Sequence, residues 1–212
     1  MSEKSKSNTS SPSKESKKII NKGTGAGGAN ATLSGGSFEK KTSLEDKLIE
    51  KKFIKHIMNK SKNGYYYEKK ESNYNIIYFN QNGFNKYVEK EYSVQTYRKP
   101  DEAIIIENDD NVHIIILEKK NQNVDGSVEE KLKTGAFTRR EYEIMFSENK
   151  KYKFKISFCF VLSKFLQNKF ESDIPKYINM KKIMKEDKIK YFFGDSKTYI
   201  DDVYDYIINN CK

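Results

Sequence analysis

The chain has 212 residues, of which 36% are hydrophobic and 33% are charged, and its formal net charge is +10. This length allows one domain of ordinary size plus a tail. The positive balance indicates a polyanionic partner such as nucleic acid, although an AT-rich genome would also enrich lysine. Two cysteines without a CxxC pair exclude a disulfide framework, and two isolated histidines exclude a zinc finger or a histidine-based nuclease motif. No stretch approaches eighteen apolar residues, so we expect a soluble cytoplasmic protein that does not bind a membrane.

Residues 1–36 form a low-complexity segment, which we expect to be a flexible, basic and glycine-rich N-terminal arm before one domain over residues 37–212. The segment has too few large apolar side chains to offset the entropy lost on ordering. Gly23, Gly25 and Gly28 formally match a dinucleotide-binding GxGxxG pattern. We reject the match because no strand precedes it and no ribose-binding acid follows at the required distance.

The first part of the domain contains one helical pattern and then alternating apolar patterns. Apolar residues recur at three- and four-residue steps from residue 37 to about 59 and predict a helix. Residues 74–79 and 84–92 are interpreted as a strand pair joined by a turn. Two runs of branched aliphatic residues, at 103–106 and 112–117, surround an acidic and polar turn and predict a β-hairpin.

The second part alternates helices and strands. Ser127 is the expected N-cap of a helix, with Glu130 as its capping-box partner. Thr134-Gly135 is expected to interrupt this helix before a second helical piece. Further strands are predicted at 154–162, suited to the centre of a sheet, and 190–193, and further helices at 138–146, 163–171, 174–187 and from Ser196 to about 209. This order predicts an α/β fold with a mixed central β-sheet flanked by helices.

Three charged residues are expected at one end of the predicted hairpin. Asp101 stands at the entry of its first strand, and Glu118 and Lys120 stand at the exit of its second. These ends are neighbours in an antiparallel pair, and residues two apart leave the same face of a strand. Two carboxylates and an ammonium suit a hard divalent cation such as Mg²⁺, which takes carboxylate, water and phosphate oxygens. The alternative is that residues 118–120 are only the solvated end of a strand.

Pro100-Asp101, followed after sixteen residues by Glu118-x-Lys120, matches the PD-(D/E)XK pattern. Most of the chain after residue 22 resembles the type II restriction endonucleases of the PD-(D/E)XK nuclease superfamily. The stretches that carry the resemblance are residues 25–30 leading to Gly36-Ser-Phe-Glu39, residues 117–122 followed by 126–134, and Tyr191-Phe-Phe-Gly-Asp195. The resemblance implies a restriction-endonuclease-like core and Mg²⁺-dependent, site-specific hydrolysis of double-stranded DNA. It also implies a homodimer that cuts both strands of a palindrome, and it raises the question of a cognate DNA methyltransferase encoded nearby.

The resemblance also implies roles for individual residues. Asp101 and Glu118 would hold one or two Mg²⁺ ions, and Lys120 would orient the attacking water and stabilise the transition state. Glu39 matches the catalytic acid that this superfamily often supplies from its first core helix. Glu45 is the alternative for that acid, and a solvent-facing position for Glu39 is equally open.

Other residues are expected around this centre. Glu102 and Asp125 are lesser candidates for the metal shell. The residues expected to contact DNA are Gln122, Lys131, Lys133, Arg139 and Arg140, together with the lysines of residues 1–41. For Arg139 and Arg140 the alternative is an exposed helix face that pairs with neighbouring glutamates. The alternative functions are a DNA repair nuclease or junction resolvase with the same core, and a non-catalytic DNA-binding module.

Overall fold

The two aliphatic runs lie side by side as antiparallel strands in the computed structural model, which describes residues 36–58, 64–123 and 128–211 of the chain. The strands are β4 (Glu102–Asn108) and β5 (Asn111–Lys120). Asn108 pairs with Asn111, so two aspartates form the turn between them. Asp109 has a φ of 51°, a left-handed conformation that aspartate tolerates better than most residues. The predicted hairpin is confirmed.

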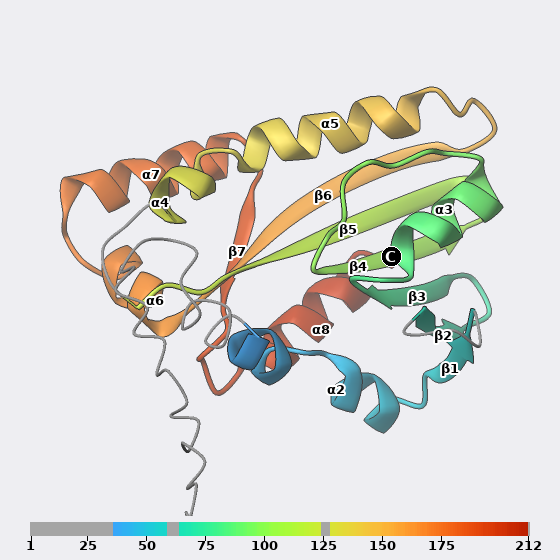
Figure 1. Ribbon diagram of the computed structural model, residues 1–212, viewed down its shortest axis with the longest axis horizontal. Coiled ribbons are helices and arrows are strands. Elements are labelled where there is room, and N and C mark those ends of the chain that lie inside the picture. Colours follow the sequence, from blue (N-terminus) through green and yellow to red (C-terminus); the bar gives the residue numbers. More distant parts are fainter. Residues whose placement is uncertain (1–35, 59–63, 124–127, 212) are drawn as a thin grey trace, which may run out of the picture.

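This hairpin lies inside a seven-stranded sheet whose strand order follows the chain from β1 to β7 (Figure 1). Strands β1 to β5 pair in antiparallel fashion, whereas β6 and β7 run parallel to β5. The other strands are β1 (Ile54–Ile57), β2 (Tyr65–Lys70), β3 (Asn75–Asn80), β6 (Lys153–Leu162) and β7 (Lys190–Phe193). The predicted α/β fold with a mixed sheet flanked by helices is confirmed.

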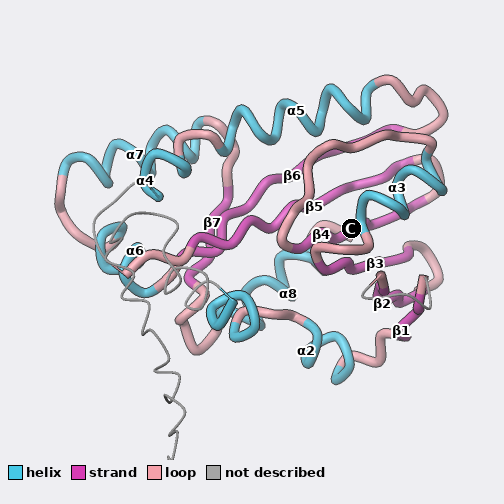
Figure 2. The backbone as a smooth tube through the Cα atoms, viewed as in Figure 1, coloured by secondary structure: helices cyan, strands magenta, loops and turns pink. Residues whose placement is uncertain are grey.

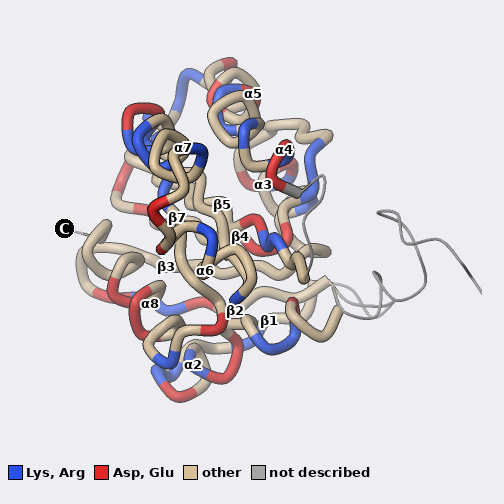
Figure 3. The backbone as a smooth tube through the Cα atoms, turned by 90° about the vertical axis from the view of Figure 1, so that its left-hand side faces the viewer, with Lys and Arg blue, Asp and Glu red and all other residues tan. Residues whose placement is uncertain are grey.

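Helices cover both faces of the sheet, because successive side chains of each buried strand alternate between the faces. One apolar cluster joins one sheet face to α3 (Phe84–Tyr92), α5 (Gly135–Ser147), α6 (Lys164–Phe170) and α7 (Pro175–Glu186). The opposite cluster joins the other face to residues 38–53, which include α2 (Glu45–Glu50), and to α8 (Tyr199–Asn209). The short helix α4 (Val128–Leu132) precedes α5. Figures 2 and 3 show α5 and α7 on one side of the sheet and α2 and α8 on the other.

The long helix predicted from residue 37 to about 59 is wrong in its second half. Residues 36–41 and α2 are helical, but the chain then turns at Lys52, where φ is 65°, and continues as β1. Ile57, which extended the helical pattern, is 76% exposed on this edge strand, as is its neighbour Ile54 at 65%. The spacing that included Ile57 therefore did not mark a buried helix face. Strand β2, which pairs with β1, was not predicted.

Residues 84–92 were interpreted as a strand and are instead helix α3. Phe84, Val88 and Tyr92 are its buried residues. They lie four apart, so they share one helix face, and that spacing also satisfies a two-residue alternation. The packing against the sheet decides between the two interpretations.

The remaining elements largely agree with the sequence. Helices α4 and α5 are separated at Thr134, as predicted, and β6 lies between β5 and the edge strand β7. The N-cap of α8 is Thr198 rather than Ser196, because residues 196–198 form a separate turn. Residues 1–35, with the proposed arm and its glycines, and the proposed cap Ser127 lie outside the described residues. Within the described residues, no helix is both long and apolar enough to cross a bilayer.

Gly194, directly after β7, allows residues 36–41 to pack closely against this end of the sheet. A Cβ atom there would lie 2.6 Å from Thr42 Cγ2 and 2.8 Å from Phe38 Cζ. We predict that Gly194→Ala lowers the free energy of unfolding by about 1–3 kcal/mol, as overpacking of a filled core does. The measurement is urea unfolding. Gly36→Ala is the control, because a Cβ there meets no atom within 4 Å, and an equal loss in both variants would contradict the prediction.

Candidate active site

The ends of β4 and β5 bring the predicted carboxylates into register. Glu102 pairs with Leu117 as the last pair of the ladder between the two strands, and Asp101 and Glu118 are the residues next to that pair. The backbone N–H of Lys119 donates a hydrogen bond of 2.7 Å to Asp101 Oδ2. Asp101 is thereby held at the point where the ladder between the two strands ends.

Glu118 and Lys120 point to the same side of the sheet, as their spacing predicts. Lys120 Nζ donates to Glu118 Oε1 at 2.6 Å, and both side chains are largely buried. They line a cavity of about 420 Å³, which we call the basic cleft. Its charged lining residues are Arg98, Lys99, Glu118, Lys120 and Lys131. Four positive groups and one carboxylate give this cleft a net positive charge.

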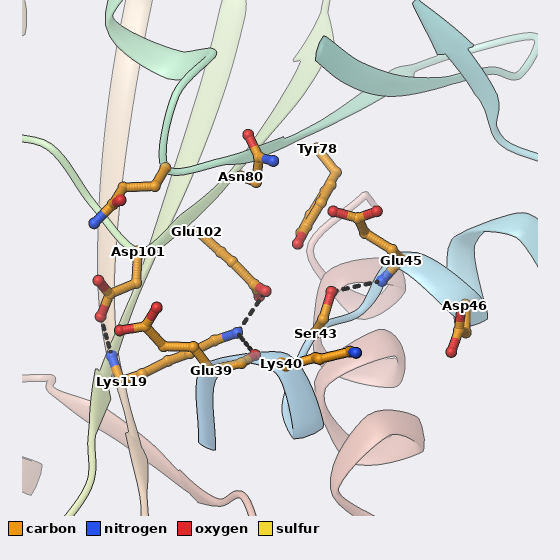
Figure 4. A pocket seen from close by; sticks show the side chains of 11 residues that line it. Glu39, Lys40, Ser43, Glu45, Asp46, Tyr78, Asn80, Asp101, Glu102 and Lys119 are labelled. Atoms are coloured by element: carbon orange, nitrogen blue, oxygen red, sulfur yellow. Dashed lines mark hydrogen bonds and ion pairs between the residues drawn. The ribbon is translucent and has the colours of Figure 1, made fainter. Parts of the chain in front are cut away.

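Asp101 and Glu39 lie on the opposite side of the strand end, in a second cavity of about 420 Å³. We call it the acidic cavity, since its charged lining residues are Glu39, Glu45, Asp46, Asp101 and Glu102 with Lys40 and Lys119. The carboxylates of Glu39 and Asp101 lie near one another there (Figure 4). Asp101 therefore borders the acidic cavity, and its charge still acts on Glu118 of the basic cleft, whose pKa it raises.

A buried ion pair between Lys119 and Glu102 holds the segments that carry Asp101 and Glu39 together. Lys119 Nζ donates to Glu102 Oε1 at 2.6 Å, and the two side chains are 3% and 4% exposed. The same ammonium donates to the backbone carbonyl of Glu39 at 3.0 Å (Figure 4). Lys119 thus connects β5 to β4 and to the helical segment that carries Glu39.

The surroundings of Glu39 and Glu118 disfavour the ionised forms of both carboxyl groups. Burial and then the negative charge of Asp101 raise the pKa of Glu118, against the opposing effect of Lys120. Burial and then Asp101 also raise the pKa of Glu39, and Lys119 opposes that rise. A cation between these groups would relieve the repulsion.

The residues present fit a hard divalent cation in charge and in donor type. Asp101 and Glu118 supply carboxylate oxygens, and Lys119 N–H occupies only Oδ2 of Asp101. In the described parts of the chain, no group of three or more His, Cys, Asp or Glu side chains is arranged so that it could hold a metal ion. Mg²⁺ commonly uses one or two carboxylates and completes its shell with waters and substrate phosphate, so two protein carboxylates are enough.

The other acids proposed for the centre have different surroundings. Glu45 accepts hydrogen bonds from the hydroxyls of Tyr65 at 2.5 Å and Tyr67 at 3.2 Å. The carboxylate of Glu39 lies near that of Asp101, whose charge raises the pKa of Glu39, which favours Glu39 as the helix acid. Glu102 is occupied by Lys119, and Asp125 lies outside the described residues.

The predicted DNA contacts are spread over several surfaces. Lys131 lines the basic cleft, whereas Gln122 is buried and lies two residues beyond the end of β5. Lys133 pairs with Glu130 at 2.8 Å. Arg139 and Arg140 both pair with Glu143 on α5, at 3.2 and 3.0 Å. The alternative of an exposed, paired helix face describes Arg140, whereas Arg139 is partly buried and also donates to the backbone carbonyl of Asp187.

Sequence reasoning missed Arg98 and Tyr142 as neighbours of Glu118. Arg98 lines the basic cleft, forms an ion pair with Glu141 and opposes the rise in the pKa of Glu118 that burial and Asp101 cause. Tyr142 lines the same cleft, and its pKa is raised by burial and then by Glu118. Arg98 lies two residues before Pro100-Asp101, and this closeness in sequence could have indicated that it lies near the site. No motif near Tyr142 in the sequence indicated the site.

We predict that Lys119→Met lowers the free energy of unfolding by about 3–5 kcal/mol, because Glu102 is left as an uncompensated buried charge. Lys119→Met with Glu102→Leu should recover most of that loss, since both charges are removed. Chemical denaturation measures both. Lys41→Met is the control: its ion pair with Asp195 is also 2.6 Å long but exposed, so its loss should cost at most about 1 kcal/mol. A double variant as unstable as the single one would contradict this account.

Comparison with protein-family models, with curated proteins and with solved structures finds no match for this chain. The resemblance to restriction endonucleases therefore rests on the sequence stretches given above. The function has to be argued from the arrangement of Asp101, Glu118, Lys120 and Glu39.

Proposed function

We propose that the chain is a Mg²⁺-dependent, site-specific endonuclease of double-stranded DNA, with a restriction-endonuclease-like core. One observation carries the chemical part of this proposal: Asp101 lies close enough to Glu118 for its charge to raise the pKa of Glu118, beside a Glu118–Lys120 pair of 2.6 Å. The site specificity, the restriction role, the homodimer and a companion methyltransferase follow from the resemblance alone.

The reaction is hydrolysis of a phosphodiester: the oxygen of a water forms a bond to phosphorus as a bridging P–O bond breaks. Mg²⁺, held by Asp101 and Glu118, would supply positive charge to the phosphate and lower the pKa of a bound water. Lys120 provides a positively charged donor for the water or for a non-bridging oxygen, where negative charge grows. Glu39, whose raised pKa favours its protonated form more than an ordinary glutamate, is a group able to exchange a proton beside Asp101.

The basic cleft supports a polyanionic substrate. Arg98, Lys99, Lys120 and Lys131 surround one side of the proposed centre, and a phosphodiester backbone is the anion that such a cleft suits. The acidic cavity on the other side repels phosphate. A DNA strand is therefore expected to approach Asp101 from the side of Glu118 and Lys120.

A repair nuclease or junction resolvase would use the same chemistry on branched or damaged DNA. A non-catalytic DNA-binding module would need the basic residues but not the Glu118–Lys120 pair. The first alternative predicts cleavage limited to branched substrates, and the second predicts binding without cleavage.

The direct test is incubation of the protein with unmethylated phage DNA and Mg²⁺. We expect discrete fragments, and we expect Lys120→Ala to abolish cutting while DNA binding, measured by fluorescence anisotropy, stays within a few-fold. Lys90→Ala is the control, because Lys90 is 77% exposed and pairs with its neighbour Glu91. Unchanged cutting by Lys120→Ala would remove Lys120 from the mechanism, and no cutting by the unaltered protein on linear or branched DNA would refute the proposed activity.

Cation binding is testable without cleavage, by thermal unfolding with and without Mg²⁺. At about one hundred times its Kd the ion should stabilise the fold by about 2.7 kcal/mol. Asp101→Asn and Glu118→Gln should lose this increment, whereas Glu148→Gln, an exposed acid at the end of α5, should keep it.

The sign of the pH dependence follows from the raised pKa values of Glu39 and Glu118. Without a cation, their ionised forms destabilise the fold, and this cost is relieved as the pH falls through the raised values. The Mg²⁺ increment should shrink over the same range, beginning above 4.5, the ordinary pKa of glutamate. An increment that persists unchanged below that value would exclude these carboxylates as ligands.

A further inference from the structure

A third cavity, of about 640 Å³, lies away from the proposed catalytic centre, where the end of α7 meets β7 and α8. Five lysines line it, and we call it the lysine groove: Lys181, Lys182, Lys185, Lys188 and Lys190. Figure 3 shows lysine or arginine positions along α7. No carboxylate lines the groove, although Glu186 and Asp187 lie in the same stretch of sequence.

The lysines of the groove differ from the lysines that are paired with acids elsewhere in the described residues. Lys41, Lys47 and Lys69 each form an ion pair with an acid. Among the described residues, none of the five groove lysines has an acidic partner within 4 Å; Lys181 donates instead to the backbone carbonyl of Phe170. Uncompensated like charges in one hollow repel one another, so the groove has an electrostatic deficit that an anionic partner would relieve.

The floor of the groove is rigid. Tyr191 packs edge-on against Phe170, with ring centroids 5.1 Å apart, and Tyr206 packs against Phe192 at 5.6 Å. Ile189 between the lysines is buried. Flexible ammonium groups therefore project from a fixed surface, which suits a repeating anion such as a phosphodiester backbone better than a single small ligand.

The strand register gives the distance from the catalytic centre. Lys190 pairs with Cys159, which pairs with Leu117, whereas Lys120 lies three residues further along β5. With about 3.3 Å per residue along a strand and about 4.8 Å between strands, the backbones of Lys190 and Lys120 are roughly 14 Å apart. The groove is therefore a separate surface on the edge of the sheet, within reach of nucleic acid that flanks a segment at Asp101.

We propose that the lysine groove binds the phosphodiester backbone of double-stranded DNA without reading its sequence, as a second contact outside the catalytic centre. The choice of DNA as the polyanion rests on the proposed function. The groove itself rests on its five unpaired lysines and its hollow, acid-free lining.

The test is the salt dependence of binding to a duplex of about 30 base pairs in EDTA, where no cleavage occurs. Affinity falls as salt rises, and each lost phosphate contact should make the slope of log affinity against log salt less steep by about 0.9. Lys182→Gln, Lys185→Gln and Lys188→Gln together should therefore make it less steep by roughly 2.7. Lys150→Gln, Lys151→Gln and Lys153→Gln form the matched control. These three exposed lysines lie before or at the start of β6, at the other end of the sheet, and their replacement should leave the slope nearly unchanged.

Equal slopes in the two triple variants would overturn the groove as a DNA contact. So would groove-dependent binding to vesicles of anionic phospholipid with no groove-dependent binding to DNA. A less steep salt slope in the groove variant supports the proposal even if the unaltered protein cuts no DNA. DNA binding by the groove and nuclease activity are therefore tested separately. Circular dichroism of each variant confirms that the fold is retained.

Discussion

The buried ion pair between Lys119 and Glu102 is the interaction on which the arrangement of the candidate active site depends. Two charges removed from water cost several kcal/mol each unless their geometry and hydrogen bonds compensate. Lys119 meets that requirement by donating to Glu102 and to the carbonyl of Glu39, and its backbone N–H binds Asp101. A single residue therefore positions one proposed catalytic carboxylate directly and the helical segment of another.

The same strand end separates charges of opposite sign. Odd-numbered side chains of β5, such as Leu117 and Lys119, face the apolar layer formed by residues 38–53 and α8, and even-numbered ones face α5. The acidic cavity and the basic cleft lie on these two sides, and Asp101 lines the acidic cavity. Perturbed carboxyl pKa values in such a place are typical of functional sites. Repulsion between the carboxylates destabilises the fold when no cation is bound, and a bound cation would relieve it.

The topology also explains why positive charge gathers at the edge formed by β7. An edge strand exposes unpaired backbone groups, and lysines there discourage pairing with another chain. That role accounts for a single residue such as Lys190. It does not account for Lys182, Lys185 and Lys188, which come from α7 and its following turn. These three lysines line the lysine groove together with Lys190. Protection of the sheet edge alone would not require them, whereas the proposed binding surface would.

The sequence by itself determined the hairpin, its turn, the α/β class and the shared face of Glu118 and Lys120, because these depend on short-range periodicity and on the two-residue repeat of a strand. It did not determine whether residues 84–92 are helix or strand, since Phe84, Val88 and Tyr92 fit both periods. Only the tertiary structure placed Glu39 near Asp101, paired Lys119 with Glu102, and placed Arg98 beside Glu118. Each of these depends on contacts between segments far apart in the chain, which local spacing does not encode.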